Sequence, residues 1–508
     1  MRMAAFTELV DLAAARLGGV ALLANDEFFA GKENLLRAET PIWIADKYTD
    51  RGKWMDGWES RRRRTPGHDW CLIRLGIPGV IRGVIVDTSF FTGNFPSQCS
   101  LDACIAPSDA LAVALAAAGT RWTEVLPKSE VRGDSENLFE VTDPRRFTHV
   151  RLNIFPDGGV ARLRVHGEPV PDWREILEEG DIVNVSAVER GGRAIDCSDR
   201  FYSHPQNLLM PYRAANMGDG WETKRRRGPG HDWAILRLGI EAIVRRVDVV
   251  TTHFKGNYPD SCSLDVARIA GEPTAATDWE EVLPPTTLGP DATHAFDVRR
   301  GAPATHVRLH MYPDGGISRV RVFGTPTREG HLREGLRALN AMDDAPLRAA
   351  LTNCCGSSAW VDRTIAARPF DDPNDLFAKS ERVWRSLRRE DWLEAFTHHP
   401  RIGDRGRAAA RSPEAHRWSA EEQGAPQTPQ NDTEEHRKTL AALTEANRAY
   451  EERFGYVFIV CATGRTSEEM LGMLRERLRS DPDAELDTAA SEQAKITRLR
   501  LEKLLTGA

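Results

Sequence analysis

The sequence lacks the marks of a disulfide-stabilised, zinc-binding or membrane-spanning protein. Its 508 residues include only eight cysteines, and none of them forms a CxxC pair or a Cys/His spacing suited to structural zinc. No run of eighteen apolar residues occurs, which is about the length that a membrane-spanning helix needs. Residues 1–24 carry Glu8, Asp11 and Arg16, which interrupt any signal-peptide core. We therefore expect a cytoplasmic protein whose thiols stay reduced.

The charge balance shows no strong excess of either sign. Lys and Arg number 68 against 75 Asp and Glu, which gives a formal net charge of −7. A protein with this balance has no long-range attraction to nucleic acid or to an anionic membrane, so we expect neither as a partner. Hydrophobic residues make up 41% of the chain, enough for large cores. At about 150 residues per domain, this length predicts roughly three or four domains.

An internal repeat organises the first two thirds of the chain. The Asp-Gly-Trp-Glu segment at 56–59 and the Gly-His-Asp-Trp segment at 67–70 both recur 163 residues later. A Thr-His-Val-Arg-Leu segment at 148–152 recurs 157 residues later, so the second copy has lost six residues in between. A unit of this size is too long for a solenoid repeat, and it indicates the duplication of a whole domain.

Within each copy, apolar and polar residues alternate along short segments. Leu163 and Val165 stand between polar neighbours, and the second copy repeats the pattern. Such alternation is typical of strands with one buried face, as in an antiparallel sandwich. We predict two tandem all-β sandwiches of the jelly-roll type, at residues 1–170 and 171–328, with the Pro-Asp-Gly-Gly segments as hairpin turns.

Beyond Pro326 the pattern becomes helical. Residues 440–450 place apolar side chains on one helix face, and Gly455 follows where a C-cap glycine would stand. The segment Thr466–Glu469 has the sequence of a capping box, which opens a helix. We predict an all-α domain over residues 335–508, so the whole chain is multidomain.

The Gly-His-Asp-Trp motif is the first candidate for catalysis. It places an imidazole beside a carboxylate just before an apolar strand, as His68 and Asp69 in the first copy and as His231 and Asp232 in the second. Side chains diverge at a strand's start, so one of each pair can face a cleft while the other caps a turn. A structural corner, with the motif's tryptophan as a core anchor, fits the sequence as well.

Runs of basic residues precede both motifs and supply candidate substrate-binding residues, namely Arg62, Arg63, Arg225 and Arg226. A guanidinium group pairs bidentately with a carboxylate, which favours a small anionic substrate. Nucleic-acid binding would need a wider basic surface with interleaved aromatics, and a solvated loop would need no ligand. The Glu before each run and the His-Asp pair after it favour a small-molecule anion site.

Two segments of the helical region are further candidates. His399 precedes a proline, which disfavours helix, so its imidazole is expected at a turn. Ser419 and Glu422 have the spacing of an ordinary capping box. A helix amino terminus is also an anion site, and Gln423 could offer an amide to a carbonyl or ureido group.

Residues 5 to about 326 resemble the allantoicase family, hydrolases that split allantoate into ureidoglycolate and urea. The resemblance rests on the following segments: Asn25–Phe29, Lys53–Ser60, Gly67–Trp70 and Asp87–Asn94. It implies a duplicated jelly-roll in which the arginines bind the substrate carboxylate and the His-Asp pairs manage protons. The copies differ at Asp87 versus Val250 and at Phe90 versus His253, so the copy that holds the site is left open.

Residues 335–505 resemble a second family, the 2-oxo-4-hydroxy-4-carboxy-5-ureidoimidazoline (OHCU) decarboxylases, all-α enzymes that make (S)-allantoin. The motifs that carry this resemblance are His399–Gly403, Ser419–Gln423 and Phe454–Ala462. It implies that His399 is the proton donor, with Glu422 as a second catalytic residue. It also implies a substrate pocket lined by Pro400, Ser419, Ala420, Glu421, Gln423, Tyr456, Val457, Phe458, Ile459 and Arg465.

The two resemblances together predict a bifunctional enzyme of urate and allantoin breakdown. No metal or organic cofactor is expected for the decarboxylation, and the metal requirement of the hydrolysis is left open. The expected partners are the two small-molecule substrates, a second copy of the chain in a homo-oligomer, and other enzymes of the urate pathway. The competing hypothesis is that the sandwiches only bind a small ligand or carbohydrate and are attached to the decarboxylase.

Overall fold

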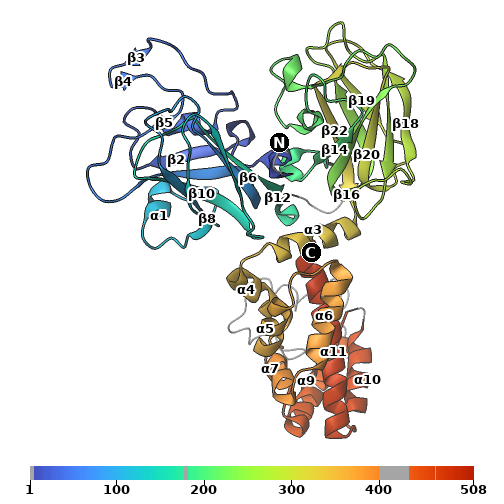
Figure 1. Ribbon diagram of the computed structural model, residues 1–508. Helices are drawn as coiled ribbons and strands as arrows, with labels where there is room; N and C mark the ends of the chain where they lie inside the picture. Colours follow the sequence, from blue (N-terminus) through green and yellow to red (C-terminus); the bar gives the residue numbers. More distant parts are fainter. Residues whose placement is uncertain (1–4, 177–180, 400–433, 464, 508) are drawn as a thin grey trace. The chain divides into compact units, whose positions relative to one another are not determined.

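The chain consists of a β-rich part followed by a helical part (Figure 1). The computed structural model describes residues 5–176, 181–399, 434–463 and 465–507. It divides the chain into two compact units, Met1–His331 and Leu332–Ala508. The predicted fold class, two tandem β-sandwiches followed by an all-α region, is confirmed.

Each sandwich is built from eight main strands in the same order. Those of the first are β1 (Val10–Asp11), β2 (Val20–Ala24), β6 (Asp69–Asp87), β7 (Gln98–Cys104), β8 (Thr123–Glu130), β9 (Glu136–Glu140), β10 (Arg146–Phe155) and β12 (Arg162–Pro169). Those of the second are β13 (Val183–Asn184), β14 (Arg193–Cys197), β16 (Asp232–Val250), β17 (Ser261–Ala267), β18 (Glu280–Thr287), β19 (Thr293–Asp297), β20 (Pro303–Tyr312) and β22 (Arg319–Pro326).

Short ribbons and two short helices complete this unit. They are β3 (Tyr48–Thr49), β4 (Gly52–Lys53), β5 (Trp58–Glu59), β11 (Gly159–Val160), β15 (Trp221–Glu222), β21 (Gly316–Ile317), α1 (Ala112–Ala116) and α2 (Trp173–Ile176).

One long strand in each sandwich belongs to both of its sheets. The first part of β6 pairs with β2 and β10, and its second part pairs with β9 and β12. The two sheets therefore run β2-β6-β10-β7-β8 and β9-β6-β12-β1. In the second sandwich β16 takes the place of β6. Because β20 ends at Tyr312 opposite the start of β16, and β22 begins at Arg319 opposite its end, both ends of β16 lie at one end of the sandwich.

Glycines within the repeated Leu-Gly-Ile segments allow a loop to approach the long strands. A Cβ atom at Gly239 would lie 1.9 Å from the carbonyl oxygen of Arg190, and one at Gly76 would lie 2.5 Å from that of Leu17. Any larger residue would push the loop away from the strand, so the packing of each sandwich requires glycine here.

The fully buried tryptophans are not those of the Gly-His-Asp-Trp motif. Trp58 and Trp221, from the Asp-Gly-Trp-Glu segments, have no exposed surface, and their indole N–H groups donate to backbone carbonyls. Trp70 is only half-buried and packs on the outer face of its sheet. The reason is strand alternation: Cys71 points into the core, so Trp70 points outward. The expectation of a core anchor at this position was wrong.

The Pro-Asp-Gly-Gly segments are not hairpin turns, contrary to the prediction. β10 and β12 flank the first of them, but both strands pair with β6 and not with each other. The segment instead carries the chain from one sheet to the other, through β11, which pairs with β5. The local turn signal was right, but it does not specify which strands pair.

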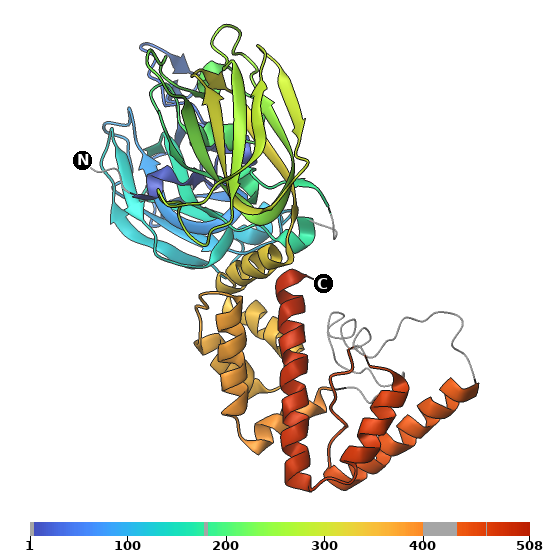
Figure 2. The ribbon, with the colours of Figure 1, turned by 90° about the vertical axis from the view of Figure 1, so that its right-hand side faces the viewer.

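The second unit contains the helices α4 (Asp344–Cys354), α5 (Ser358–Ala366), α6 (Pro373–Arg385), α7 (Arg389–Thr397), α9 (Glu434–Phe454), α10 (Ser467–Arg477) and α11 (Pro482–Thr506), and α3 (Arg328–Asn340) leads into it. The long α11 packs against α4 and α6, and α9 packs against α10 (Figure 2). The predicted capping box at Thr466 and Glu469 and the left-handed Gly455 after α9 are both confirmed. No helix in the described ranges is long and apolar enough to cross a membrane.

A buried histidine in the second sandwich makes an acid-stability prediction. His306 is 3% exposed, and burial next to Arg237 lowers its pKa to about 4. An unfolded histidine binds its proton near pH 6.5, so we expect stability to fall as pH drops from about 6.5 towards 4. In His306→Gln this acid-side loss should be smaller. Thermal melts at pH 7 and pH 5 check it, and an unchanged pH dependence would contradict it.

Candidate functional site

The aspartates of the Gly-His-Asp-Trp motifs are buried partners of an arginine. Arg63 Nη1 lies 2.5 Å from Asp69 Oδ1, and Arg226 pairs with Asp232 in the same way. Both carboxylates are only 1% exposed. Each ion pair therefore fixes its arginine run to the start of the long strand, and the neighbouring histidine points elsewhere.

In the second sandwich, that histidine leads a chain of polar contacts on the outer face of one sheet. His231 Nε2 lies 2.7 Å from His310 Nδ1, and His310 Nε2 lies 2.9 Å from Asp265 Oδ2. His231 directly precedes β16, His310 lies near the end of β20, and Asp265 lies within β17. Strand register brings them together, because His310 is the partner of both Trp233 and Ser263.

The charges around this chain define its protonation. Burial alone would raise the pKa of Asp265, but hydrogen bonds from His310 and from Arg308 (2.6 Å) outweigh it and lower the pKa. An ionised carboxylate only accepts, so we assign the hydrogen on Nε2 of His310, although Arg308 Nε also lies 3.1 Å from that nitrogen. Burial, with His310 and Arg226 nearby, lowers the pKa of His231. His231 is therefore neutral at neutral pH, with Nδ1 as a proton acceptor.

The first sandwich has a different set of residues at the same positions. Asn153 replaces the second histidine and Phe155 replaces Tyr312. Asn153 Nδ2 donates to Asp102 (2.9 Å), and His68 packs its ring on Phe155 at 4.6 Å between centroids. The His–His–Asp chain is thus present in only one copy of the described sandwiches.

Sequence reasoning found His231 but missed His310, Asp265 and Tyr312, whose ring packs against that of His231 with 4.5 Å between the centroids. All three lie in segments that the repeat aligns. The signal available was the difference between copies, because Asn153 becomes histidine and Phe155 becomes tyrosine within otherwise matching strands.

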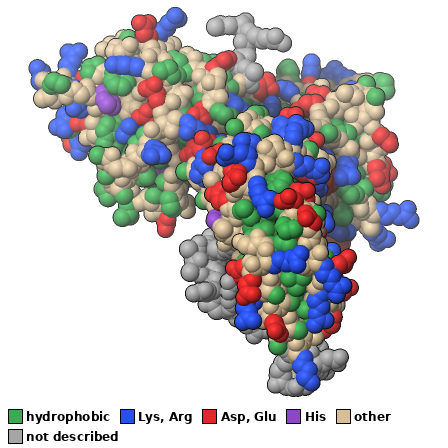
Figure 3. All heavy atoms as spheres, turned by 90° about the horizontal axis from the view of Figure 1, so that it is seen from below, with side chains coloured by type: hydrophobic (Ala, Val, Ile, Leu, Met, Phe, Trp, Pro, Cys, Tyr) green, Lys and Arg blue, Asp and Glu red, His purple; other side chains and the backbone are tan. Residues whose placement is uncertain are grey.

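The remaining arginines of the runs lie on the surface. Arg62 and Arg225 are exposed on the loops before the long strands. On the face of the molecule drawn in Figure 3, basic and acidic side chains are interspersed. That face offers no broad basic surface of the kind that nucleic acid requires.

In the helical unit, His399 follows the C-cap residue of α7, His398, so it lies outside the helix as the proline at 400 predicts. The predicted Pro400, Ser419, Ala420, Glu421, Glu422 and Gln423 lie outside the described residues.

The predicted segment Tyr456–Ile459 is an irregular stretch held from both sides. Arg477 Nη1 donates to the carbonyl of Ile459 (2.8 Å), and Glu492 accepts from the N–H of Cys461 (2.8 Å). Tyr456, Phe458 and Ile459 are buried, while Val457 is half-buried. The backbone here is free of helix and strand pairing, which leaves it available to a ligand.

Arg465 is exposed, and its guanidinium group is directed back at its own segment. Its Nε donates to the carbonyl of Cys461 (3.1 Å). The Arg477–Glu485 ion pair (2.6 Å), which is almost fully buried, supports the same region, and Tyr450 donates to Glu485.

Comparison with known proteins follows this division into two parts. Residues 10–170 and 183–327 match the family profile described as allantoicase repeat. A probable allantoicase from Burkholderia pseudomallei is 47% identical over 333 residues, which cover 63% of this chain and 96% of that protein. The crystal structure of allantoicase from Saccharomyces cerevisiae is 34% identical, covers 62% of this chain and 92% of that one, and has a TM-score of 0.52.

The chain belongs to the allantoicase family. Residues 340–502 match a second profile, OHCU decarboxylase. A crystal structure of OHCU decarboxylase in the presence of (S)-allantoin is 32% identical and covers 32% of this chain and 99% of that one, with a TM-score of 0.26. The chain is therefore a bifunctional enzyme of purine catabolism that combines an allantoicase with an OHCU decarboxylase domain. The carbohydrate-binding hypothesis for the sandwiches is not better supported than this enzymatic function.

Among the described residues, no group of three or more His, Cys, Asp and Glu side chains is placed to hold a metal ion.

Proposed function

We propose that allantoate is hydrolysed to ureidoglycolate and urea on the outer face of the second sandwich, with His231 as the acid–base residue. The observation that carries this assignment is the His231–His310–Asp265 chain, which the first sandwich lacks. The partly buried carboxylate of Asp265 orients His310, and His310 in turn orients His231. This is the arrangement that holds a general base in one tautomer.

The reaction makes modest demands on these groups. The bond between the central carbon and one ureido nitrogen breaks, a water oxygen joins that carbon, and one water proton ends on the departing nitrogen. Nδ1 of neutral His231 can take the proton from water and pass it to the leaving urea. Arg226, whose side chain is about a third exposed beside Asp232, and Arg308 supply positive charge for the substrate carboxylate.

The hydrolysis should depend on pH through His231. Because its pKa is lowered below the ordinary value of about 6.5, the base form persists at neutral pH. We expect kcat/KM for urea release to be flat near pH 7 and to fall towards about tenfold per pH unit once pH drops below the lowered pKa. A rate that stays constant or rises from pH 7 to pH 4 would count against this base. Running each point with and without a chelator also tests a metal requirement.

For the second activity we propose that His399 donates the proton in the decarboxylation of OHCU to (S)-allantoin, with Glu422 as its partner. The backbone of Tyr456–Ile459, held by Arg477 and Glu492, would form one wall of the pocket. Loss of carbon dioxide leaves electron density that the ureidoimidazoline ring absorbs, so protein groups suffice and no cofactor is proposed.

We further propose a cytoplasmic homo-oligomer that works beside other enzymes of the urate pathway. All eight cysteines are free thiols, which supports a reducing compartment. Burial raises the pKa of Cys99 and Cys262 to about 12, so these thiols stay protonated. Sedimentation of the purified chain would test the oligomeric state.

A further inference from the structure

A polar hollow lies on the sheet of the second sandwich opposite to the one that carries His310 and Asp265. It has a volume of about 400 Å³, and we name it the arginine pocket. Its principal lining residues are Arg213, Thr252, Thr293, Ser318, Arg319 and Arg321. It is built where β16 ends, β19 begins and β22 begins, whereas His231 lies at the start of β16 on the outer face of the opposite sheet.

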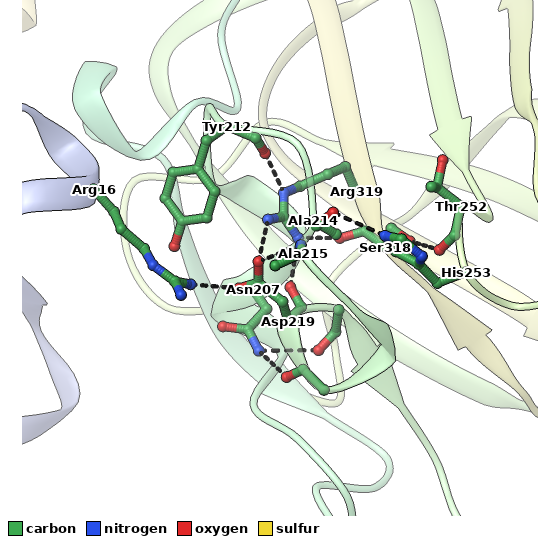
Figure 4. A network of polar contacts seen from close by, with 12 residues as sticks. Arg16, Asn207, Tyr212, Ala214, Ala215, Asp219, Thr252, His253, Ser318 and Arg319 are labelled. Carbon is green, nitrogen blue, oxygen red and sulfur yellow. Dashed lines mark hydrogen bonds and ion pairs between the residues drawn. The ribbon is translucent and has the colours of Figure 1, made fainter. Parts of the chain in front are cut away.

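Arg319 lines this pocket and is held by a network of hydrogen bonds (Figure 4). It is 1% exposed and donates from Nε to the carbonyl of Tyr212 (2.9 Å) and from Nη1 to the carbonyl of Asp219 (2.5 Å). Asp219 also lies 3.4 Å from Nη2 of Arg319 and 3.4 Å from Arg16. The carboxylate of Asp219 thus lies between the guanidinium groups of Arg16 and Arg319. The bond from Arg319 to the carbonyl of Tyr212 holds the loop that carries Arg213.

The other two arginines have no such partner. Among the described residues, neither Arg213 nor Arg321 forms a side-chain hydrogen bond or an ion pair within 4 Å. The strand neighbour of Arg321, Asp248, is paired with Arg246 at 3.0 Å. Asp291, at the rim, accepts the backbone N–H of His253 (2.8 Å). The unpaired guanidinium groups of Arg213 and Arg321 therefore line a hollow whose one carboxylate, that of Asp291, already accepts a hydrogen bond from the backbone.

The half-buried Glu189 interacts electrostatically with Arg321 but forms no ion pair with it within 4 Å. Arg321 counts among the charges that lower the pKa of Glu189, although burial dominates and raises it. This residue leaves the guanidinium group of Arg321 open to a ligand.

In the first sandwich, acidic residues and ion pairs offset the positive charge at the position that corresponds to the arginine pocket. Arg164, the counterpart of Arg321, pairs with Asp11 at 3.7 Å and donates to a backbone carbonyl. Strand register puts Asp87 where the second sandwich has Val250, and Glu136 where it has Thr293. Thr40 stands at the position of Arg213, counted from the matching Asn-Leu-Leu segments. Only the second copy has kept a cationic pocket, so general sandwich stability does not require it.

We propose that the arginine pocket binds a small organic carboxylate. Two free guanidinium groups match the two oxygens of a carboxylate, and the hydroxyl groups of Thr252 and Thr293 can bond to amide or hydroxyl groups on the rest of the molecule. The ligand is either the allantoate or ureidoglycolate of the proposed hydrolysis or another carboxylate metabolite. The binding claim itself does not rest on the position of the hydrolytic site.

The test uses calorimetric titration of the full-length protein with ureidoacetate, a ureido carboxylate without a second ureido group to expel, and with its neutral amide. We expect ureidoacetate to bind and its amide to bind at least tenfold more weakly. The double variant Arg213→Gln with Arg321→Gln should bind ureidoacetate about 10-fold to 100-fold more weakly, because each lost hydrogen bond is charge-assisted. The matched control is Arg164→Gln in the first sandwich, which should bind normally.

A second variant guards against misfolding. Thr293→Glu copies the first sandwich at an exposed position and should weaken binding of ureidoacetate at least tenfold by repulsion, with an unchanged melting temperature. No binding to the unmodified protein, equal binding of the amide, or normal affinity in both variants would overturn the proposal. Urea-release kinetics then identify the source: a raised KM in Thr293→Glu assigns the pocket to allantoate, and unchanged kinetics with lost binding assign it to another carboxylate.

Discussion

Replacing His231 by alanine should lower kcat for urea release from allantoate by about 100-fold to 10,000-fold, the usual contribution of a general acid–base group. The reason is that His231 is the terminal member of the His231–His310–Asp265 chain, and its Nδ1 is the acceptor that the chain leaves available. KM should change less than kcat, because an acid–base group acts mainly in the transition state. Steady-state urea release by the purified full-length variant provides the measurement.

The duplication supplies the matched control. His68→Ala removes the equivalent imidazole of the first sandwich, where Asn153 and Phe155 replace the rest of the chain, so hydrolysis should be nearly unchanged. His310→Asn copies the first sandwich into the second and should cost less than His231→Ala but far more than His68→Ala. Equal losses at His68 and His231 would mean that both copies catalyse, and no loss at either would remove the Gly-His-Asp-Trp histidines from the mechanism.

Replacing His399 by alanine should reduce decarboxylation of OHCU by about 100-fold to 10,000-fold while leaving urea release intact. His399 is placed at the end of α7, and the proposed role requires a proton donor at the carbon that loses carbon dioxide. Stopped-flow loss of OHCU absorbance, with circular dichroism to follow the stereochemistry of the allantoin formed, measures the effect. A proton donor held on one side of the substrate selects one configuration of the product, so the variant should also lose the excess of one enantiomer.

The second activity of the same polypeptide is the internal control for this variant. Normal urea release would show that the protein is folded, and His231→Ala should in turn decarboxylate normally. Full decarboxylation by His399→Ala would rule the residue out as proton donor. A parallel fall of both activities would instead indicate a folding defect, which the melting temperature would reveal.

Local and repeated patterns gave much of the fold. The constant offset between Asp56 and Asp219 identified the duplication, and the capping box at Thr466 identified the start of a helix. Pairing between distant strands was not accessible in this way. The Pro-Asp-Gly-Gly turns have the composition of hairpins, yet the strands that flank them pair with β6, because that strand is long enough to serve both sheets.

In the candidate site, too, local patterns were predictable from the sequence and contacts between distant strands were not. The His-Asp pairs were expected to act together, but a strand sends adjacent side chains apart, so Asp232 meets Arg226 while His231 meets His310. That second contact joins residues 79 positions apart and depends on strand register. Composition and spacing do not carry register, although comparing the two copies residue by residue would have singled out His310.

The strand shared by both sheets also determines the order in which each sandwich can fold. β16 needs β20 to complete its first half and β22 to complete its second, and β22 is the last strand of its copy. The pairing of β16 with β20 and β22 therefore joins residues far apart in the sequence, and such high contact order is typical of folding in milliseconds to seconds. During synthesis, half of the backbone groups of β16 stay unpaired until β20 and β22 have left the ribosome. The two sheets of the sandwich then form at the same time.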